Sequence, residues 1–209
     1  MYVPQHFAAT DDDVRTLLSQ GAAADLVTVT AQGLVATFLP FLYDPDAGEH
    51  GSLLGHVARN NDQWRLPAAG DSLVIVHGPD SYISPNFYAS KAENHRVVPT
   101  WNYLTAHVYG QLVVHDDVTW LSSLVRRLTD FHEAREPRAW SVNDAPAPYI
   151  AGQLRAIVGV ELVISRVEAK AKLSQNRPAA DIDGVVAGLL ARGDEPGAEA
   201  VRAATPPTA

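Results

Sequence analysis

The sequence predicts a mainly β protein, a six-stranded antiparallel barrel with peripheral helices. Six closely spaced segments have strand character, and the alternating strand–helix repeat of a doubly wound sheet is missing. Hydrophobic residues make up 46% of the 209 positions and charged residues 19%, which is typical of a chain that folds around a core. We expect one domain over residues 1–193 and a flexible tail over residues 194–209.

The N-terminal half is predicted to hold one helix and four strands. Thr10 and Asp13 have the spacing of a capping box, so a short amphipathic helix should run to about Gly21. The expected strands are 26–30, 34–43, 52–57 and 72–77, and the turn-rich Gly78-Pro79-Asp80 should end the last of them. The second strand carries apolar side chains on both faces, so neither face is suited to water.

The C-terminal half supplies the other two strands and most of the helices. From Trp101 to Gly110, aromatic and polar residues alternate with aliphatic ones, which predicts a fifth strand with one core face and one ring-bearing face. The ring-bearing face suits a partner subunit, a flat ligand or a packed helix. A sixth strand is expected over 157–172. Helices should begin at Asp116-Asp117, lie around 149–154, and run from 182 to 193.

Composition excludes several classes of function. The net charge of −8 opposes binding to a phosphate backbone, and the absence of cysteine removes disulfides, thiolate metal sites and thiol nucleophiles. GxGxxG, GxxxxGK, HExxH and GxSxG motifs are all missing from the sequence. The apolar runs are too short for a membrane-spanning helix, and no signal-peptide pattern precedes the fold, so we expect a cytoplasmic protein without a membrane partner.

Three polar and aromatic clusters follow predicted strands. Residues 55–61 offer an imidazole, a guanidinium and two carboxamides that could hold a phosphate; the alternative is an arginine paired to an acid and asparagines that cap a helix. Residues 81–88 combine hydroxyls with rings, and residues 170–177 gather two of the three lysines. Together they suit a planar, phosphorylated cofactor. His115-Asp116-Asp117 is interpreted as a helix cap in preference to a metal site.

Seven segments, in this order, resemble a known family. They are MYVPQHF, LLGHVARNN, GPDSYISPNFY, VPTWNY, HVYGQL, IVGVEL and KAKLSQNR. The series, which spans residues 1–190, is similar to the PaiB-type FMN-binding negative transcriptional regulators. The resemblance implies an FMN-binding split barrel of the pyridoxamine-phosphate-oxidase type, as a homodimer with cofactor sites at the subunit interface.

The resemblance also implies a set of cofactor contacts. The phosphate or ribityl chain would lie near Arg59 and Asn60 with His56 behind them, and the isoalloxazine along the second strand. The complete implied set is Thr37, Phe38, Leu39, His56, Arg59, Asn60, Trp101, Asn102, Lys172, Ser174, Gln175 and Asn176. Some of these would come from the other subunit. Where the family commonly has a histidine before Leu-Pro, this chain has Phe38, so chemistry that needs that imidazole is not expected.

Three functions remain open at this point. The first is a flavoprotein that regulates indirectly, because no helix-turn-helix is evident and direct nucleic-acid binding is not expected. The second is a haem enzyme resembling the piperazate synthases, which form a nitrogen–nitrogen bond; His56 would be the axial ligand of haem b. The third is an FMN-dependent oxidoreductase that acts on a small substrate.

Overall fold

The computed structural model describes residues 1–205, which form two compact units. The barrel unit comprises residues 15–76 and 107–167, and the helical unit comprises residues 1–14, 77–106 and the chain from Glu168 onward. The sequence predicted one domain over 1–193. Each unit is therefore assembled from separate stretches of chain, and the chain passes between them along three long strands, β5 (Ser72–Ile83), β6 (Thr100–His115) and β7 (Ile157–Lys172).

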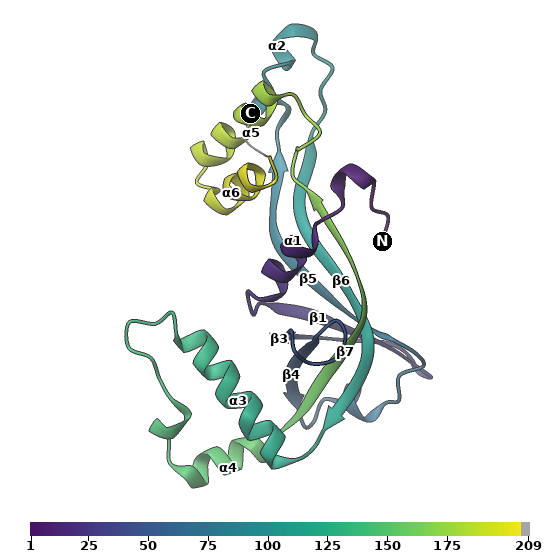
Figure 1. Ribbon diagram of the computed structural model, residues 1–209, viewed down its shortest axis with the longest axis vertical. Coiled ribbons are helices and arrows are strands. Elements are labelled where there is room, and N and C mark those ends of the chain that lie inside the picture. Colours follow the sequence, from purple (N-terminus) through teal and green to yellow (C-terminus); the bar gives the residue numbers. More distant parts are fainter. Residues whose placement is uncertain (206–209) are drawn as a thin grey trace. The chain divides into compact units, whose positions relative to one another are not determined.

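Seven strands form a single sheet in the order β2-β1-β5-β6-β7-β4-β3 (Figure 1). The other four strands are β1 (Ala23–Thr30), β2 (Gly33–Pro40), β3 (Leu42–Asp44) and β4 (Ser52–Ala58). The two outermost strands, β2 and β3, are consecutive in sequence and separated only by the buried Phe41. The two ends of the sheet are therefore joined by a single residue of chain, and this arrangement confirms the split-barrel fold.

The seventh strand arises because the predicted second strand, 34–43, is broken at Phe41. The Phe41 backbone N–H donates to Ala22 O (3.3 Å), and β3 then pairs with β4. A Cβ placed on Gly55 of β4 would come within 3.0 Å of Leu39 Cδ1 and of Pro40 O, so only glycine allows β4 to pack this closely against the corner. Periodicity alone does not reveal such a corner, because both halves keep strand alternation.

The barrel unit is filled by aliphatic side chains and covered by helices. Leu26, Val74, Val158 and Leu162 are fully buried in its wall. Helices α3 (Val118–Glu133) and α4 (Ala147–Arg155) follow β6, with the short turn η4 (Val142–Asp144) between them. Asp117 caps α3 by accepting from the Trp120 backbone N–H at 2.7 Å, as the sequence predicted. The barrel unit also contains η2 (Asp62–Arg65), and the boundary between the two units falls within α1 (Asp11–Leu18).

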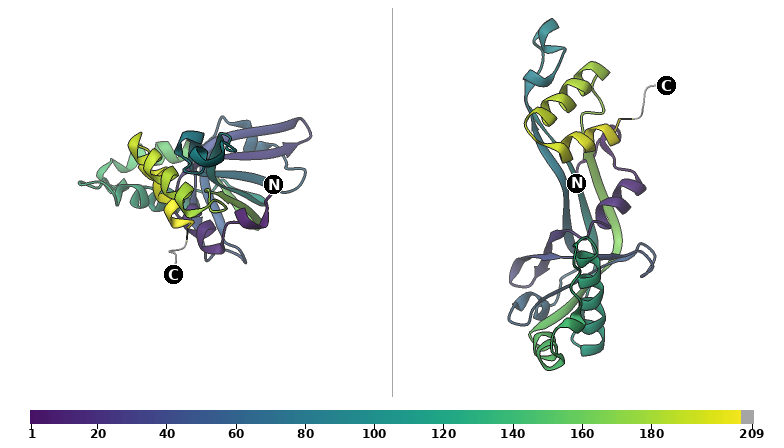
Figure 2. Two further views of the ribbon diagram at one scale, coloured as in Figure 1. Left: turned by 90° about the horizontal axis from the view of Figure 1, so that it is seen from above. Right: turned by 90° about the vertical axis from the view of Figure 1, so that its left-hand side faces the viewer.

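The helical unit has its own apolar cluster. Helices α5 (Ala179–Ala191) and α6 (Glu195–Ala203) lie side by side in Figure 2 and bury Val185, Leu189 and Val201 with Tyr88. The short elements here are η1 (Gln5–Phe7), η3 (Pro85–Phe87) and α2 (Lys91–Asn94). Within residues 1–205, no helix is both long and apolar enough to cross a lipid bilayer.

Two sequence-based boundaries were wrong. Gly78-Pro79-Asp80 was expected to end the fourth strand, yet β5 continues through it to Ile83. The residues after 193 were expected to be a loose tail, but 195–203 form α6, because Asp194 caps the helix at Gly197 N and Ala198 and Val201 are fully buried. Residues 206–209 of the expected tail lie outside the described residues.

Replacing Gly110 tests the close approach of β6 and β7. An added Cβ would lie 2.1 Å from the backbone oxygen of Val163, which can move only with its strand. We expect Gly110→Ala to lower the free energy of unfolding by about 1–3 kcal/mol, measured by chemical denaturation. Gly70→Ala is the control, because an added Cβ there meets no atom within 4 Å. Equal stability of the two variants would contradict the packing.

Candidate functional site

The predicted cofactor residues fall into two groups, one in each unit. Thr37, Phe38, Leu39, His56, Arg59 and Asn60 belong to the barrel unit, and Trp101, Asn102, Lys172, Ser174, Gln175 and Asn176 belong to the helical unit. The sequence-based prediction grouped all twelve in one cofactor site, whereas the structure assigns six of them to each unit. The binding role of these twelve residues stays a prediction.

Arg59, which follows β4, is fully engaged within the barrel unit. Its Nη1 and Nη2 donate to the two carboxylate oxygens of Asp116 at 3.0 and 2.5 Å. Nε donates to Arg155 O at 2.7 Å, and Nη2 also donates to Ile157 O at 3.0 Å. The hydrogen bond from Arg59 lowers the pKa of Asp116, and the same bond raises the pKa of Arg59. The arginine–acid pairing weighed from the sequence is thus present.

Thr37 of β2 belongs to a polar network inside the barrel wall. Its hydroxyl donates to Gln63 Oε1 at 2.5 Å and accepts from Asn61 Nδ2 at 2.8 Å. Gln63 is only 2% exposed, and its Nε2 also donates to Thr28 Oγ1 at 3.0 Å and to Leu26 O at 3.2 Å. Asn61 also caps η2, the other half of the alternative weighed for residues 55–61. Sequence reasoning missed Gln63, because nothing local marks a glutamine that turns inward.

His56 lies on β4, directly opposite Gly159 on β7. Directly paired residues of antiparallel strands share a face, and a Cβ on Gly159 would lie 2.2 Å from the Trp120 ring, so that indole of α3 covers the same face. Burial lowers the pKa of His56, which keeps its imidazole neutral at neutral pH. Within residues 1–205 the ring makes no hydrogen bond or ion pair.

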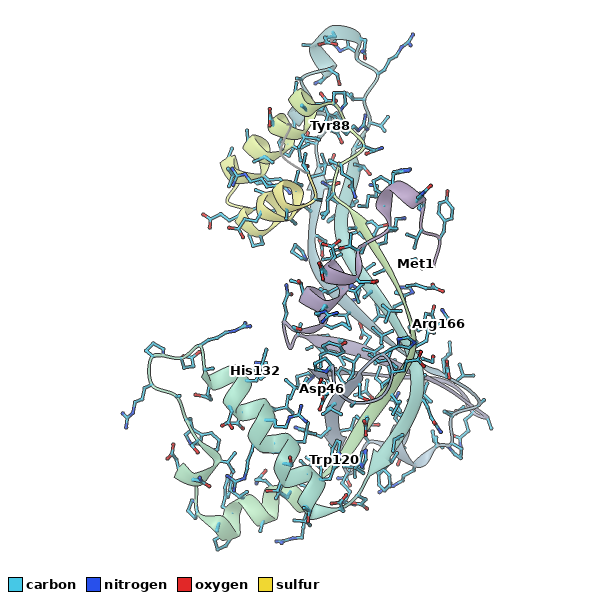
Figure 3. All side chains as sticks on the ribbon, viewed as in Figure 1. Met1, Asp46, Tyr88, Trp120, His132 and Arg166 are labelled. Carbon is cyan, nitrogen blue, oxygen red and sulfur yellow. The ribbon has the colours of Figure 1, made fainter. Side chains whose placement is uncertain are left out.

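A second histidine near this face was not singled out from the sequence as a site residue. His115, at the end of β6, stacks on Trp120 with ring centroids 3.9 Å apart and an interplanar angle of 6°. Its Nε2 lies 2.7 Å from Glu161 Oε2. Figure 3 labels Trp120 at the start of α3. The only sequence signal was the position of His115 beside the helix cap, because the partner Glu161 is 46 residues away.

The face of β2 that carries Leu34 and Phe38 is exposed. Phe38 is 67% exposed and Leu34 is 74% exposed, whereas Leu39 is buried. The expectation that both faces of this strand are covered is therefore not met within one chain. Asn60 is also exposed. In the described part of the chain, one face of β2 is apolar and open.

In the helical unit, the predicted residues surround the end of β7. Asn102 and Ser174 are buried and hydrogen bond to each other, with Asn102 Nδ2 donating to Ser174 Oγ at 2.9 Å. Ser174 has a φ of 65°, a left-handed conformation that is uncommon for serine. Gln175 accepts from the Leu173 backbone N–H at 2.7 Å. These side chains hold the turn after β7, and Asn176 is exposed.

Lys172 and Trp101 remain on the surface of the same unit. Lys172 Nζ donates to Thr100 Oγ1 and to Trp101 O, while the Trp101 indole is 55% exposed. Lys170, two residues earlier on β7, lies 5.6 Å from the centroid of the Tyr103 ring. Of the residues 1–205, no three His, Asp or Glu side chains form a group that could hold a metal ion.

Comparison with known proteins agrees with this architecture. The family described as "Putative FMN-binding domain" matches residues 1–166. The chain belongs to this family. It is 32% identical over 190 residues to the protease synthase and sporulation protein PAI 2 of Bacillus subtilis, covering 89% of this chain and 87% of that protein. An uncharacterised protein of Saccharomyces cerevisiae is 31% identical over 163 residues, covering 68% of this chain and 96% of that protein.

Solved structures share the fold of this FMN-binding family member. The flavocytochrome Anf3 of Azotobacter vinelandii has a TM-score of 0.56 at 15% identity, covering 81% of this chain and 72% of that one. The FAD and haem binding protein of Mycobacterium smegmatis has a TM-score of 0.52 at 18% identity, covering 88% and 80%. These likenesses establish the barrel fold.

Replacing Gln63 tests the polar network. Gln63→Leu leaves the hydroxyls of Thr37 and Thr28 without their buried partner, so we expect a loss of about 1–3 kcal/mol in the free energy of unfolding. Chemical denaturation measures the loss. Gln153→Leu, at an exposed position of α4, is the matched control and should change stability little. A Gln63 variant as stable as the control would show that the network contributes nothing to the free energy of unfolding.

Proposed function

We propose that this protein binds FMN and acts as a flavoprotein. The observation that carries the proposal is the FMN-binding family match over residues 1–166, which includes every strand of the barrel up to Arg166 in β7. The candidate contacts are the twelve residues predicted from the sequence. The residues fit such a cofactor: the helical unit offers ammonium groups and an exposed indole, and the barrel unit offers β2, whose Thr37 is held in place by Gln63.

The proposed flavin supplies redox chemistry when it is bound, and the chain supplies binding and orientation. The names of the relatives do not determine the biological consequence of that binding. PAI 2 is named for protease synthesis and sporulation, and we propose that any regulatory role of this chain is indirect, through the bound cofactor or a protein partner. The net charge of −8 supports an indirect role, because it opposes direct contact with nucleic acid. We also propose a cytoplasmic location.

Haem is the second candidate cofactor, and His56 is the observation that favours it. Its imidazole is neutral, and neutral imidazole is the ligating form. Two proteins of the same fold carry haem in their descriptions, the flavocytochrome and the FAD and haem binding protein. We rank haem below FMN, because the family match names FMN.

An absorption spectrum of the purified protein separates the two cofactors. We expect a yellow protein that releases fluorescent FMN on denaturation and whose spectrum is the same in His56→Ala. A Soret band that disappears in His56→Ala but persists in His50→Ala would establish haem instead. His50 is the control because it is exposed and lies in the same unit. A colourless protein that quenches no flavin fluorescence on titration would rule out the flavin function.

We further propose a homodimer that uses the open apolar face of β2, with cofactor sites at the subunit interface. Leu34 and Phe38 lie on one face of β2 and are 74% and 67% exposed, and an exposed apolar face of this kind suits a subunit interface. Light scattering should give about twice the chain mass of 22.5 kDa. Phe38→Ser should shift the equilibrium toward monomer, whereas Tyr149→Ser, at a similarly exposed ring of the same unit, should not. A wild-type mass equal to that of one chain would contradict the dimer.

A further inference from the structure

Two lysines, Lys170 and Lys172, share one sheet face of the helical unit, and Arg177 follows in the turn after β7, close enough to lower the pKa of Lys172; we call these three residues the cation cluster. Lys170 and Lys172 are two residues apart on β7, so their side chains leave the same face of the strand. The ring of Tyr103, on the neighbouring strand β6, lies between them, with its centroid 5.6 Å from Lys170 Nζ and 6.0 Å from Lys172 Nζ. Two of the three lysines of the chain therefore flank one ring.

The acidic residue nearest to the cation cluster along β7 is Glu168, which lies on the same face of the strand as Lys170. Considering residues 1–205, neither lysine nor Arg177 forms an ion pair with a carboxylate. Glu168 is contacted by the amino group of Met1. Burial and then the charges of Lys170 and Arg177 lower the pKa of Lys172. Lys172 is thus repelled by two other cations, and an anion bound beside it would relieve that repulsion.

Exposed aromatic rings continue the same sheet beside the lysines. Trp101 precedes Tyr103 by two residues on β6 and is 55% exposed. Tyr82, on the adjacent strand β5, is 42% exposed and meets the Trp101 ring edge to face at a centroid distance of 6.0 Å. Open rings beside cations suit a ligand that carries a phosphate on a flat ring system.

Arg59, the phosphate candidate of the barrel unit, differs from the cation cluster in one respect. Its guanidinium is already neutralised by Asp116 and donates to two backbone oxygens as well. A phosphate at Arg59 would have to compete with the Asp116 carboxylate, whereas the contacts of Lys170 within residues 1–205 are with uncharged groups, the Tyr2 carbonyl oxygen at 3.4 Å and the rings of Tyr2 and Tyr103.

We propose that Lys170 and Lys172 bind the phosphate group of FMN, with the exposed face of Trp101 available to its flat ring system. The assignment rests on the proposed flavin function and makes the lysines the residues that distinguish FMN from riboflavin. Tyr103 is new to the site, and Lys170, which the sequence placed in the polar cluster 170–177, now has a specific role beside Lys172.

The test compares the affinities of the protein for FMN and riboflavin, measured by quenching of flavin fluorescence. Wild type should prefer FMN, and added salt should weaken the binding of FMN but not that of riboflavin. Lys170→Gln should weaken FMN binding about 10-fold, the size of one charge-assisted hydrogen bond, and change riboflavin binding less than about 2-fold. The double variant Lys170→Gln/Lys172→Gln should lose most of the preference.

Control variants separate charge from folding. Lys91→Gln removes the remaining lysine of the chain, which lies in the same unit and bonds Asn86, and it should leave the preference intact. Lys172 hydrogen bonds to Thr100 and to Trp101 O, so its replacement also removes contacts that hold the end of the strand. The hydrogen bond of Lys170 to Tyr2 O is long, so Lys170→Gln changes the charge with less effect on the fold. Thermal unfolding of each variant checks that the fold persists.

The ways in which the test can fail are distinguishable. If wild type binds neither flavin, the flavin function fails and the lysine assignment fails with it. If wild type binds FMN and riboflavin equally, or if the lysine variants keep the preference while Arg59→Gln loses it, the assignment to the lysines is overturned and the flavin function stands.

Discussion

The structure of the barrel unit depends on the corner at Phe41, which joins the two ends of the sheet. The two edge strands, β2 and β3, are successive in the chain, and Phe41 turns the corner between them. The chain itself joins the two ends of the sheet at this corner, because β2 pairs with β1 and β3 pairs with β4. The corner is narrow enough that β4 carries Gly55 where it meets Pro40. The corner also fixes the position of β2, which carries some of the proposed flavin contacts.

Polar side chains inside this wall are held almost entirely by other parts of the same unit. Gln63 joins Thr37 to Thr28, and Arg59 is locked to Asp116. These contacts hold the side chains in place and neutralise the charge of Arg59. They therefore favour a rigid barrel whose polar groups are already paired. Charges without a carboxylate partner are found on the β7 surface of the helical unit. In the proposed flavin function, the barrel unit provides a rigid framework and the lysines of β7 provide positive charge.

The comparisons support one fold for several cofactors. The family match names FMN, whereas two proteins with the same fold are described with haem as well as flavin. Fold alone therefore does not select the cofactor, and the selection must come from particular side chains. In this chain we propose two candidates for that role, the neutral His56 and the lysine pair of β7.

The sequence by itself determined the strand pattern, the capped helix at Asp117 and the family, because alternation, capping and ordered motifs are local signals. It also grouped Asn102 with Ser174, which hydrogen bond to each other in the structure. Tertiary structure decided the corner at Phe41, the packing of 195–203 as a helix, and the partners of the charged groups. Arg59 and Asp116 are 57 residues apart, so no local pattern could reveal whether that guanidinium is neutralised. Only the fold shows that the two lysines of β7 flank a ring of the neighbouring strand β6.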